Sequence, residues 1–217
     1  MTAWSSPQTV AGFARSSANP TLLAVARDRR AQGSYRCLDI GCGAARNAVV
    51  LAREGWHVLG TDVSGPMLHA AVERVRTEAP SARTLFAAAP MDRLPVPDGW
   101  ADLVIAHGIW NLARSAWEFR AAAREAARAA RPGACLFLFT FSRHTLPDAA
   151  RPVPGEPFVF TQFSGEPQCF VTREQLLAEL ASASFHPDPA LPLHELNRPT
   201  RPIRTGPVIW EGTFRRT

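Results

Sequence analysis

Tyr35-Arg-Cys-Leu-Asp-Ile-Gly41-Cys42-Gly43-Ala-Ala-Arg46-Asn47 is the stretch of this chain that decides its fold. A short apolar run ends there in an acidic residue and two glycines, and an apolar helix pattern follows. A second apolar run begins at His57 and ends in the carboxylate of Asp62. Glycines let the backbone turn sharply and approach a ligand, and an acid at the end of the second strand can accept the hydroxyls of a ribose. The stretch therefore predicts a βαβ unit that holds an adenosine-like cofactor.

The regions around this stretch alternate between strand and helix patterns. We expect strands near 36–40, 57–61, 84–88, 102–106 and 135–141 and helices near 44–54, 65–77 and 117–130. Such alternation predicts an α/β fold in which helices cover both faces of a parallel sheet. Thr172-Arg-Glu-Gln175 fits a capping box and predicts a further helix, which strands near 190–196 and 207–214 follow.

Two segments stand outside this alternation, within what the length of 217 residues predicts to be one domain. Residues 1–34 are expected to form an N-terminal helical cap, in which Trp4 and Phe13 are placed to close over the cofactor. Residues 143–170 are rich in Pro, Gly and Phe, and predict a lid or cap over the acceptor. Phe160 and Phe163 are candidate substrate contacts there, although their spacing is equally typical of a half-buried strand.

Composition limits the environment and the partners of the chain. The net charge is +5 and every basic side chain is an arginine; most are spread along helices as on a solvated face. The 198–216 segment is denser, with Arg198, Arg201, Arg204, Arg215 and Arg216. The four cysteines form no CxxC pair, and the longest apolar run, near 134–141, is too short to cross a bilayer. We expect a cytoplasmic protein with reduced thiols, a monomer or homodimer with no membrane partner.

Two cofactor classes compete for the glycine stretch. A dinucleotide-binding dehydrogenase requires G-x-G-x-x-G, but Arg46 stands where the third glycine belongs. The order Asp39-Ile-Gly41-Cys42-Gly43, together with Asp62, resembles the first motif of class I S-adenosylmethionine-dependent methyltransferases. The segments Ser64-Gly-Pro-Met67, Pro90-Met91-Asp92, Trp100-Ala-Asp102-Leu-Val and Ala130-Arg-Pro-Gly133 resemble later segments of the same family. The likeness covers roughly residues 35–142.

The resemblance implies both a fold and a set of cofactor contacts. The fold is a Rossmann-like three-layer sandwich with a seven-stranded, mostly parallel sheet whose last strand is antiparallel. S-adenosylmethionine would bind, and S-adenosylhomocysteine would leave as product. The implied cofactor-binding residues are Asp39, Gly41, Cys42, Gly43, Arg46, Asp62, Val63, Met67, Met91, Asp92, His107 and Trp110. Many family members carry another glycine where this chain has Ala45; we expect Ala45 in the first helical turn, at a negative φ that alanine tolerates.

Methyl transfer by in-line displacement asks the protein mainly for positioning and a site poor in water. His107, at the end of the fourth strand, is the candidate general base, and His144 after the fifth strand is the alternative. Each of them can instead be a structural or substrate-orienting histidine. Trp110 is a candidate aromatic wall beside the sulfonium and the substrate, or an ordinary core tryptophan. The remaining histidines show no metal-like spacing, so no metal is expected.

The acceptor is the least determined part of the prediction. A nucleic-acid amino methyltransferase is expected to carry Asn/Asp-Pro-Pro-aromatic after the fourth strand, and this chain has His107-Gly-Ile-Trp110-Asn111 instead. This favours a small-molecule acceptor with an O, S or N nucleophile. A nucleic-acid methyltransferase and a non-catalytic, cofactor-binding scaffold with a basic tail are the open alternatives.

Overall fold

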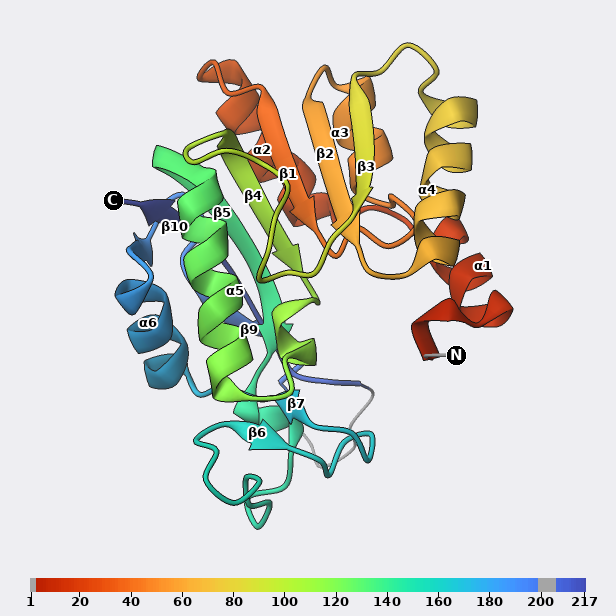
Figure 1. Ribbon diagram of the computed structural model, residues 1–217. Helices are drawn as coiled ribbons and strands as arrows, with labels where there is room; N and C mark the ends of the chain where they lie inside the picture. The colour runs from red at the N-terminus through yellow and green to blue at the C-terminus, as the bar shows by residue number, and fades with distance from the viewer. Residues whose placement is uncertain (1–2, 199–205) are drawn as a thin grey trace.

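A computed structural model describes residues 3–198 and 206–217 of the chain. Its centre is an eight-stranded sheet in the order β3-β2-β1-β4-β5-β10-β8, with β9 also paired to β10 (Figure 1). The parallel strands are β1 (Arg36–Ile40), β2 (His57–Asp62), β3 (Thr84–Ala88), β4 (Ala101–His107) and β5 (Ala130–Phe141). The carboxyl ends of these strands meet at one edge of the sheet, where open α/β sheets bind their ligands.

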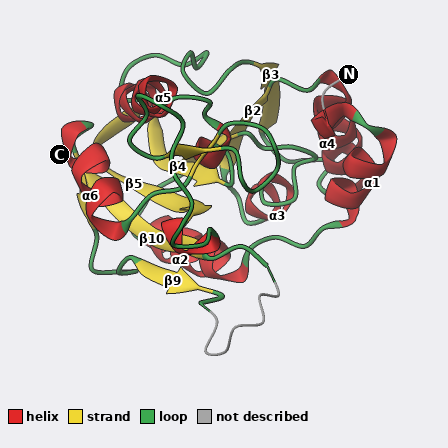
Figure 2. Ribbon diagram, turned by 90° about the horizontal axis from the view of Figure 1, so that it is seen from below, coloured by secondary structure: helices red, strands yellow, loops and turns green. Residues whose placement is uncertain are grey.

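Helices cover both faces of this sheet, as Figure 2 shows for α2 and α5. One core forms against α2 (Pro20–Ala31), α3 (Ala48–Arg53) and α4 (Gly65–Glu78). The other forms against α5 (Ala116–Ala129) and α6 (Arg173–Ser182). Small buried alanines along α5 let this helix approach the sheet closely, while its exposed side carries charged residues. The predicted α/β three-layer sandwich is confirmed.

The last strands differ from the prediction in number. The chain folds as β8 (Phe185–Pro187), β9 (His194–Leu196) and β10 (Ile209–Arg216), where one strand near 190–196 and one near 207–214 were expected. β8 and β9 pair with opposite ends of β10, and all these pairings are antiparallel. Three prolines stand between Phe185 and His194 and cannot donate to a ladder, which explains the division. The antiparallel last strand is confirmed by its pairing with β5.

The two flanking segments lie at the edge where the parallel strands end. The first contains η1 (Ala3–Ser5) and α1 (Pro7–Arg15), which packs against α4. The second contains η3 (Arg143–Thr145) and a small hairpin of β6 (Val159–Phe160) and β7 (Gln168–Cys169), which lies beyond the sheet edge in Figure 1. η2 (Trp110–Leu112) follows β4 at the same edge. Sequence segments far apart therefore converge on one region.

The turn after β1 departs from the expected geometry. α3 begins at Ala48, so residues 44–47 form turns rather than the first helical turn. Ala45 adopts a φ of 60°, in the left-handed region, so the expected negative φ is wrong. The loop keeps the conformation that a glycine would take, and the alanine methyl is buried within the α2–α3 core.

Candidate active site

A cavity of about 520 Å³ opens at the carboxyl ends of β1, β2, β4 and β5. Its lining is mostly apolar and comes from five parts of the chain: Trp4, Ser5, Phe13, Gly41, Gly43, Arg46, Asp62, Val63, Ser64, Met67, His107, Gly108, Ile109, Leu112 and Phe139. The ring of Trp4 meets that of Phe13 edge-on at 5.9 Å, so the N-terminal segment contributes an aromatic wall. The cavity is therefore enclosed by residues that are distant in sequence.

The glycine loop forms the floor of this cavity. Gly41 has a φ of 67°, and a Cβ there would lie 2.7 Å from the Ile109 side chain. Gly43 has a φ of 53°, and its N–H donates to Asp62 Oδ2 at 3.0 Å. Asp62 Oδ1 accepts from the N–H of Ser64 at 2.8 Å. The carboxylate of Asp62 thus ties the glycine loop to the start of α4 and keeps lone pairs that face the cavity.

Asp39 lies beneath the loop at the end of β1 and is almost completely buried. Its Oδ2 has no hydrogen-bond partner in the structure. Burial raises the pKa of Asp39 to about 7, with the charge of Asp62 acting in the same direction and that of Arg46 opposing it. A buried carboxylate oxygen without a partner costs free energy, so the position of Asp39 calls for an explanation beyond the fold.

His107 and Arg46 meet at the other side of the cavity. Arg46 Nη2 donates to His107 Nδ1 at 2.7 Å, and the guanidinium lies over the ring of Phe13 at 6.0 Å. The imidazole stacks on Phe139 with centroids 4.1 Å apart. Burial lowers the pKa of His107 to about 3, and the neighbouring charge of Arg46 adds to the effect. His107 is therefore a neutral ring at physiological pH.

Comparisons with known proteins agree with this geometry. Residues 37–133 match the family model described as a methyltransferase domain. A crystal structure of an S-adenosylmethionine-dependent methyltransferase from Methanosarcina mazei is similar over 93% of this chain and 99% of its own, with 18% identity and a TM-score of 0.69.

Residues 37–133 therefore match a methyltransferase domain, and the fold is that of the S-adenosylmethionine-dependent methyltransferase from Methanosarcina mazei.

Other similarities mark how far this assignment extends. The [4+2]-cyclase SpnF is similar with a TM-score of 0.62 and 25% identity, over 82% of this chain and 59% of its own. The 18S rRNA (guanine-N(7))-methyltransferase RID2 of Arabidopsis thaliana is 51% identical over 37 residues, which are 17% of this chain and 13% of that protein. The chain spans less than a fifth of the length of the curated relatives it matches.

The methyltransferase domain brings together seven of the predicted cofactor residues in the cavity: Gly41, Gly43, Arg46, Asp62, Val63, Met67 and His107. Asp39 and Cys42 are buried beneath it, where the N–H of Cys42 donates to the carbonyl of Thr61. Trp4 and Phe13 also line the cavity, as their position predicted. The role of each of these residues stays a prediction.

Three further predicted contacts, besides Asp39 and Cys42, lie outside the lining. Trp110 has no exposed surface and packs against Phe119 at 5.8 Å, because η2 turns this side chain into the core under α5. The structure corrects the placement of Trp110 as a wall of the cavity. Met91 is buried in the same core, and Asp92 is half-buried in the loop after β3.

The predicted residues of the 143–170 segment also lie away from the lining of the cavity. Phe160 is buried in a small cluster with Leu146 and Phe170, and Phe163 meets Phe170 at the rim of that cluster. His144 is half-exposed, and its Nδ1 lies 2.7 Å from Glu195 Oε1. These three side chains build the interior and surface of the segment, which explains their spacing without a substrate.

Several lining residues carry no sequence signal. Ser5, Ser64, Gly108, Ile109, Leu112 and Phe139 line the cavity but were not predicted as site residues. Phe139 is one aromatic residue within the apolar run of β5, and only the pairing of β5 with β4 brings it beside His107. Gly108 and Ile109 follow β4 directly, so their position at a strand end was the available signal.

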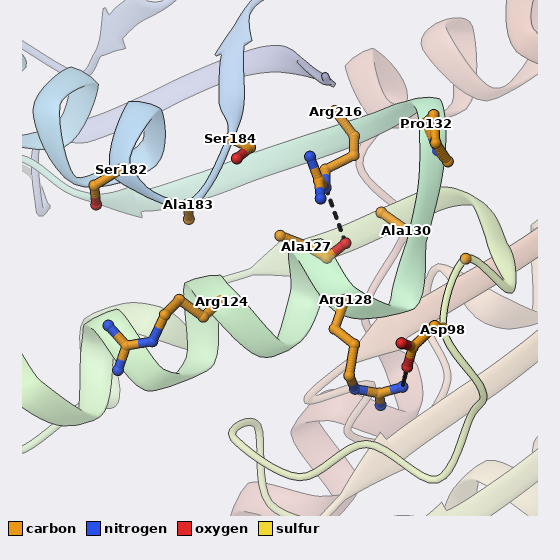
Figure 3. Close-up of a pocket in the computed structure, with 11 residues that line it drawn as sticks. Asp98, Arg124, Ala127, Arg128, Ala130, Pro132, Ser182, Ala183, Ser184 and Arg216 are labelled. Carbon is orange, nitrogen blue, oxygen red and sulfur yellow. Dashed lines mark hydrogen bonds and ion pairs between the residues drawn. The ribbon is translucent and has the colours of Figure 1, made fainter.

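Among the other concavities of the described residues, two have larger volumes than this cavity. One, of about 730 Å³, covers the face of β2 and β3 that no helix shields. The other, of about 590 Å³, lies at the carboxyl end of α5 and is shown in Figure 3. There Arg216 donates to the carbonyl of Ala127 and Arg128 pairs with Asp98. Arg216 thus satisfies a carbonyl at the end of α5, and Arg128 places a positive charge in the last turn of this helix.

Further observations concern metals, membranes and the tail. Among residues 3–198 and 206–217, no group of three or more His, Cys, Asp or Glu residues is placed to hold a metal ion. No helix in the same part of the chain is long and apolar enough to cross a bilayer.

All four cysteines are free and buried. In the basic tail, Arg215 pairs with Asp188 and Arg198 with Glu195, while Arg201 and Arg204 lie outside the described residues.

Proposed function

We propose that this protein transfers a methyl group from S-adenosylmethionine to a small-molecule acceptor. One observation carries the proposal: the unpaired Oδ2 of Asp39 and the carboxylate of Asp62 lie at the glycine loop that forms the floor of one enclosed cavity. The cofactor has an ammonium group, ribose hydroxyls and a sulfonium cation. Two carboxylates and an aromatic wall are complementary to these groups.

The residues present fit this cofactor. Asp39 offers the ammonium an oxygen that has no other partner, and Asp62 offers the ribose hydroxyls the lone pairs that its two backbone donors leave free. Gly41 and Gly43 keep the floor free of side chains. Arg46 supplies a positive charge at the cavity for the carboxylate of the methionine moiety. When bound, the cofactor supplies the electrophilic methyl carbon.

The chain's own residues contribute positioning and exclusion of water. Trp4 and Phe13 close the cavity from the N-terminal segment, and Ser5 Oγ lies 3.1 Å from Ser64 Oγ at the start of α4. Phe139 and the neutral ring of His107 form the wall on the β4–β5 side. Holding two reactants in such an enclosure is the main source of rate in a displacement that needs no covalent intermediate.

A small acceptor fits this enclosure better than a polynucleotide. The cavity is lined largely by apolar side chains, and its charged groups are Arg46 and Asp62. Nucleic-acid binding would call for clustered arginines around the opening, whereas Arg120 and Arg128 pair with carboxylates on α5 and α6 and in the β3–β4 loop. The similarity to RID2 keeps RNA as the alternative acceptor.

Calorimetry with S-adenosylhomocysteine tests the cofactor part of the proposal. We expect Asp62→Ala to weaken binding by about 100-fold, since hydrogen bonds to a charged group contribute ~1.5–3 kcal/mol each. Asp98→Ala, which removes an exposed carboxylate at the far end of α5, is the matched control and should bind normally. Equal affinities for Asp62→Ala and the unmodified protein would contradict the proposal.

The acceptor part is tested by turnover of donor with a labelled methyl group. We expect transfer to small thiols, phenols, amines or carboxylic acids and none to total RNA. Transfer to RNA alone would favour the nucleic-acid alternative. Tight cofactor binding without transfer to either class would favour a scaffold.

A further inference from the structure

A chain of part-buried polar groups continues from the cavity behind His107 to the buried Glu211. His107 Nε2 lies 3.1 Å from Asn19 Nδ2, and Asn19 Nδ2 donates to Glu211 Oε1 at 2.8 Å. Glu211 is buried in β10, and its Oε2 lies 3.7 Å from His194 Nε2 on β9. None of the motifs in the sequence includes Asn19 or Glu211. The group therefore calls for an explanation of its own.

The orientation of the Asn19 amide is fixed from several directions. Its Oδ1 accepts from the N–H groups of Thr21 and Leu22 at 2.9 and 3.1 Å and caps α2. Its backbone N–H donates to Asn47 Oδ1 at 3.1 Å, which ties it to the start of α3. The Nδ2 therefore cannot exchange places with Oδ1 without losing these bonds, and it presents an N–H to His107.

His107 consequently faces a donor at each ring nitrogen. Arg46 Nη2 lies 2.7 Å from Nδ1, and a guanidinium can only donate. A neutral imidazole has one acceptor nitrogen and satisfies one of the two donors. An imidazolium has none, so gaining a second proton would set N–H against N–H on both sides. The arrangement opposes protonation of His107 by geometry as well as by burial.

No neighbouring charge compensates for this. The rings of Phe137 and Phe139 on β5 cover His107 at 6.3 and 4.1 Å. The Asp39 carboxylate on β1 interacts with Arg46, and the Glu211 carboxylate is separated from the ring by Asn19. On the cavity side, the other carboxylate is Asp62, whose two oxygens already accept backbone N–H groups. In the described lining, the groups able to take a proton from an acceptor are thus Asp62, which two backbone donors and the ribose would engage, and His107, which faces Arg46 and Asn19.

We propose that Asn19, oriented by Glu211, is a positioning residue that keeps His107 neutral and closed to a second proton. The site therefore selects acceptors whose nucleophile is already ionised at neutral pH, such as a thiolate or a carboxylate. This selectivity rests on the proposed methyl transfer, whereas the state of the ring does not. The acceptor's electron pair forms the bond to the methyl carbon, the carbon–sulfur bond breaks with its pair left on sulfur, and no proton moves.

Nuclear magnetic resonance titration of the ring nitrogens tests the role of Asn19 directly. In the unmodified protein we expect His107 to stay neutral from pH 8 to pH 5. Asn19→Ser keeps an N-cap residue for α2 but removes both N–H groups, and should raise the protonation midpoint of His107 by at least one pH unit. Protonation of His107 between pH 8 and pH 5 in the unmodified protein, or an unchanged midpoint in Asn19→Ser, would overturn the proposal.

Two acceptors of matched shape test the selectivity. Benzenethiol ionises near neutral pH and phenol does not, although both offer the same ring. We expect methylation of benzenethiol at a rate that follows its own ionisation, and at least 100-fold slower transfer to phenol at pH 7. Comparable transfer to phenol that is lost in His107→Phe would show a base at work and overturn the inference. If the unmodified protein does not bind S-adenosylhomocysteine, that result would instead contradict the proposed function. The titration of His107 tests the role of Asn19 independently of that result.

Discussion

The β1–β2 edge and the β4–β5 edge of the cavity differ in the hydrogen-bond partners of their titratable groups. At the first, Asp39 is buried with one carboxylate oxygen that has no partner. At the second, His107 is buried with a donor at each ring nitrogen. Both groups stand at the ends of neighbouring parallel strands, and burial shifts the pKa of each toward its neutral form.

Because of this difference, Asp39 is suited to bind a cation, and His107 is not suited to accept a proton. An unpaired carboxylate oxygen gains most from an incoming ammonium group, because the ligand removes the cost of leaving that oxygen unsatisfied. A ring that already meets two donors loses hydrogen bonds when it takes a proton. The β1–β2 edge can thus receive a positively charged ligand. The β4–β5 edge can orient a ligand without taking up a proton.

The largest expected effect comes from removing the acid of the first edge. Asp39→Asn keeps the size of the side chain but loses its charge, and should weaken S-adenosylhomocysteine binding by about 10- to 100-fold, as the ~1.5–3 kcal/mol of a charged hydrogen bond implies. In the unmodified protein, affinity should fall as much as tenfold per pH unit below about 7, where Asp39 gains its proton. Calorimetry at several pH values measures both effects. A pH-independent affinity between pH 5 and 8 would mean that Asp39 is not the partner of the ammonium group.

The second prediction compares how Asp39 and His107 change the free energy of unfolding with pH. Between about pH 3.8 and 7 the folded protein holds a proton on Asp39 that the unfolded chain releases, so this group lowers stability as pH rises. Between about pH 3 and 6.5 the unfolded chain holds a proton on His107 that the folded protein lacks, so this group raises stability as pH rises. The two contributions oppose each other where the windows overlap.

Substitution should expose each contribution separately. Relative to the unmodified protein between pH 4.5 and 6, Asp39→Asn should add a slope of up to ~+1.4 kcal/mol per pH unit, and His107→Phe one of up to ~−1.4 kcal/mol per pH unit. Urea unfolding at each pH provides the measurement. Slopes of the same sign in the two variants would remove the contrast between the edges.

The smallest effect concerns the loop that connects the two edges. Ala45→Gly relieves about 1 kcal/mol of left-handed strain but loses a buried methyl worth ~0.8 kcal/mol and some backbone entropy, so its stability should stay within about 1 kcal/mol of the original. Ala123→Gly is the matched control, because it removes a buried methyl from the middle of α5 and should cost about 2 kcal/mol. Equal losses in the two variants would show that Ala45 stores no strain.

Prediction from sequence was strongest where function depends on local backbone. The glycine loop, Asp39, Asp62 and the capping box at Thr172 all follow from spacing of a few residues, and the structure has them as strand ends, turns and a helix cap. Prediction was weaker where the local pattern allows two conformations. Ala45 was expected at a negative φ, yet the buried turn imposes a positive one.

Prediction was weakest for side chains whose partners are distant in sequence. Trp110 and His107 are three residues apart beside the same strand end, but one enters the core and the other lines the cavity. Phe139 and Asn19 reach His107 only because β5 pairs with β4 and because α2 begins beside the glycine loop. No spacing rule connects residues 19, 46, 107, 139 and 211.

The sequence by itself determined the βαβ unit, the parallel sheet and the acids at its edge, because glycine conformation, apolar periodicity and strand-end carboxylates act over short distances along the chain. Only the tertiary structure decided which side chains enclose the cavity and which atoms of them remain unpaired. Burial and hydrogen-bond partners set the protonation of Asp39 and His107, and both arise from contacts between segments up to 192 residues apart. The acids at the strand ends are therefore readable from the sequence, while the protonation of Asp39 and His107 emerges from the packing.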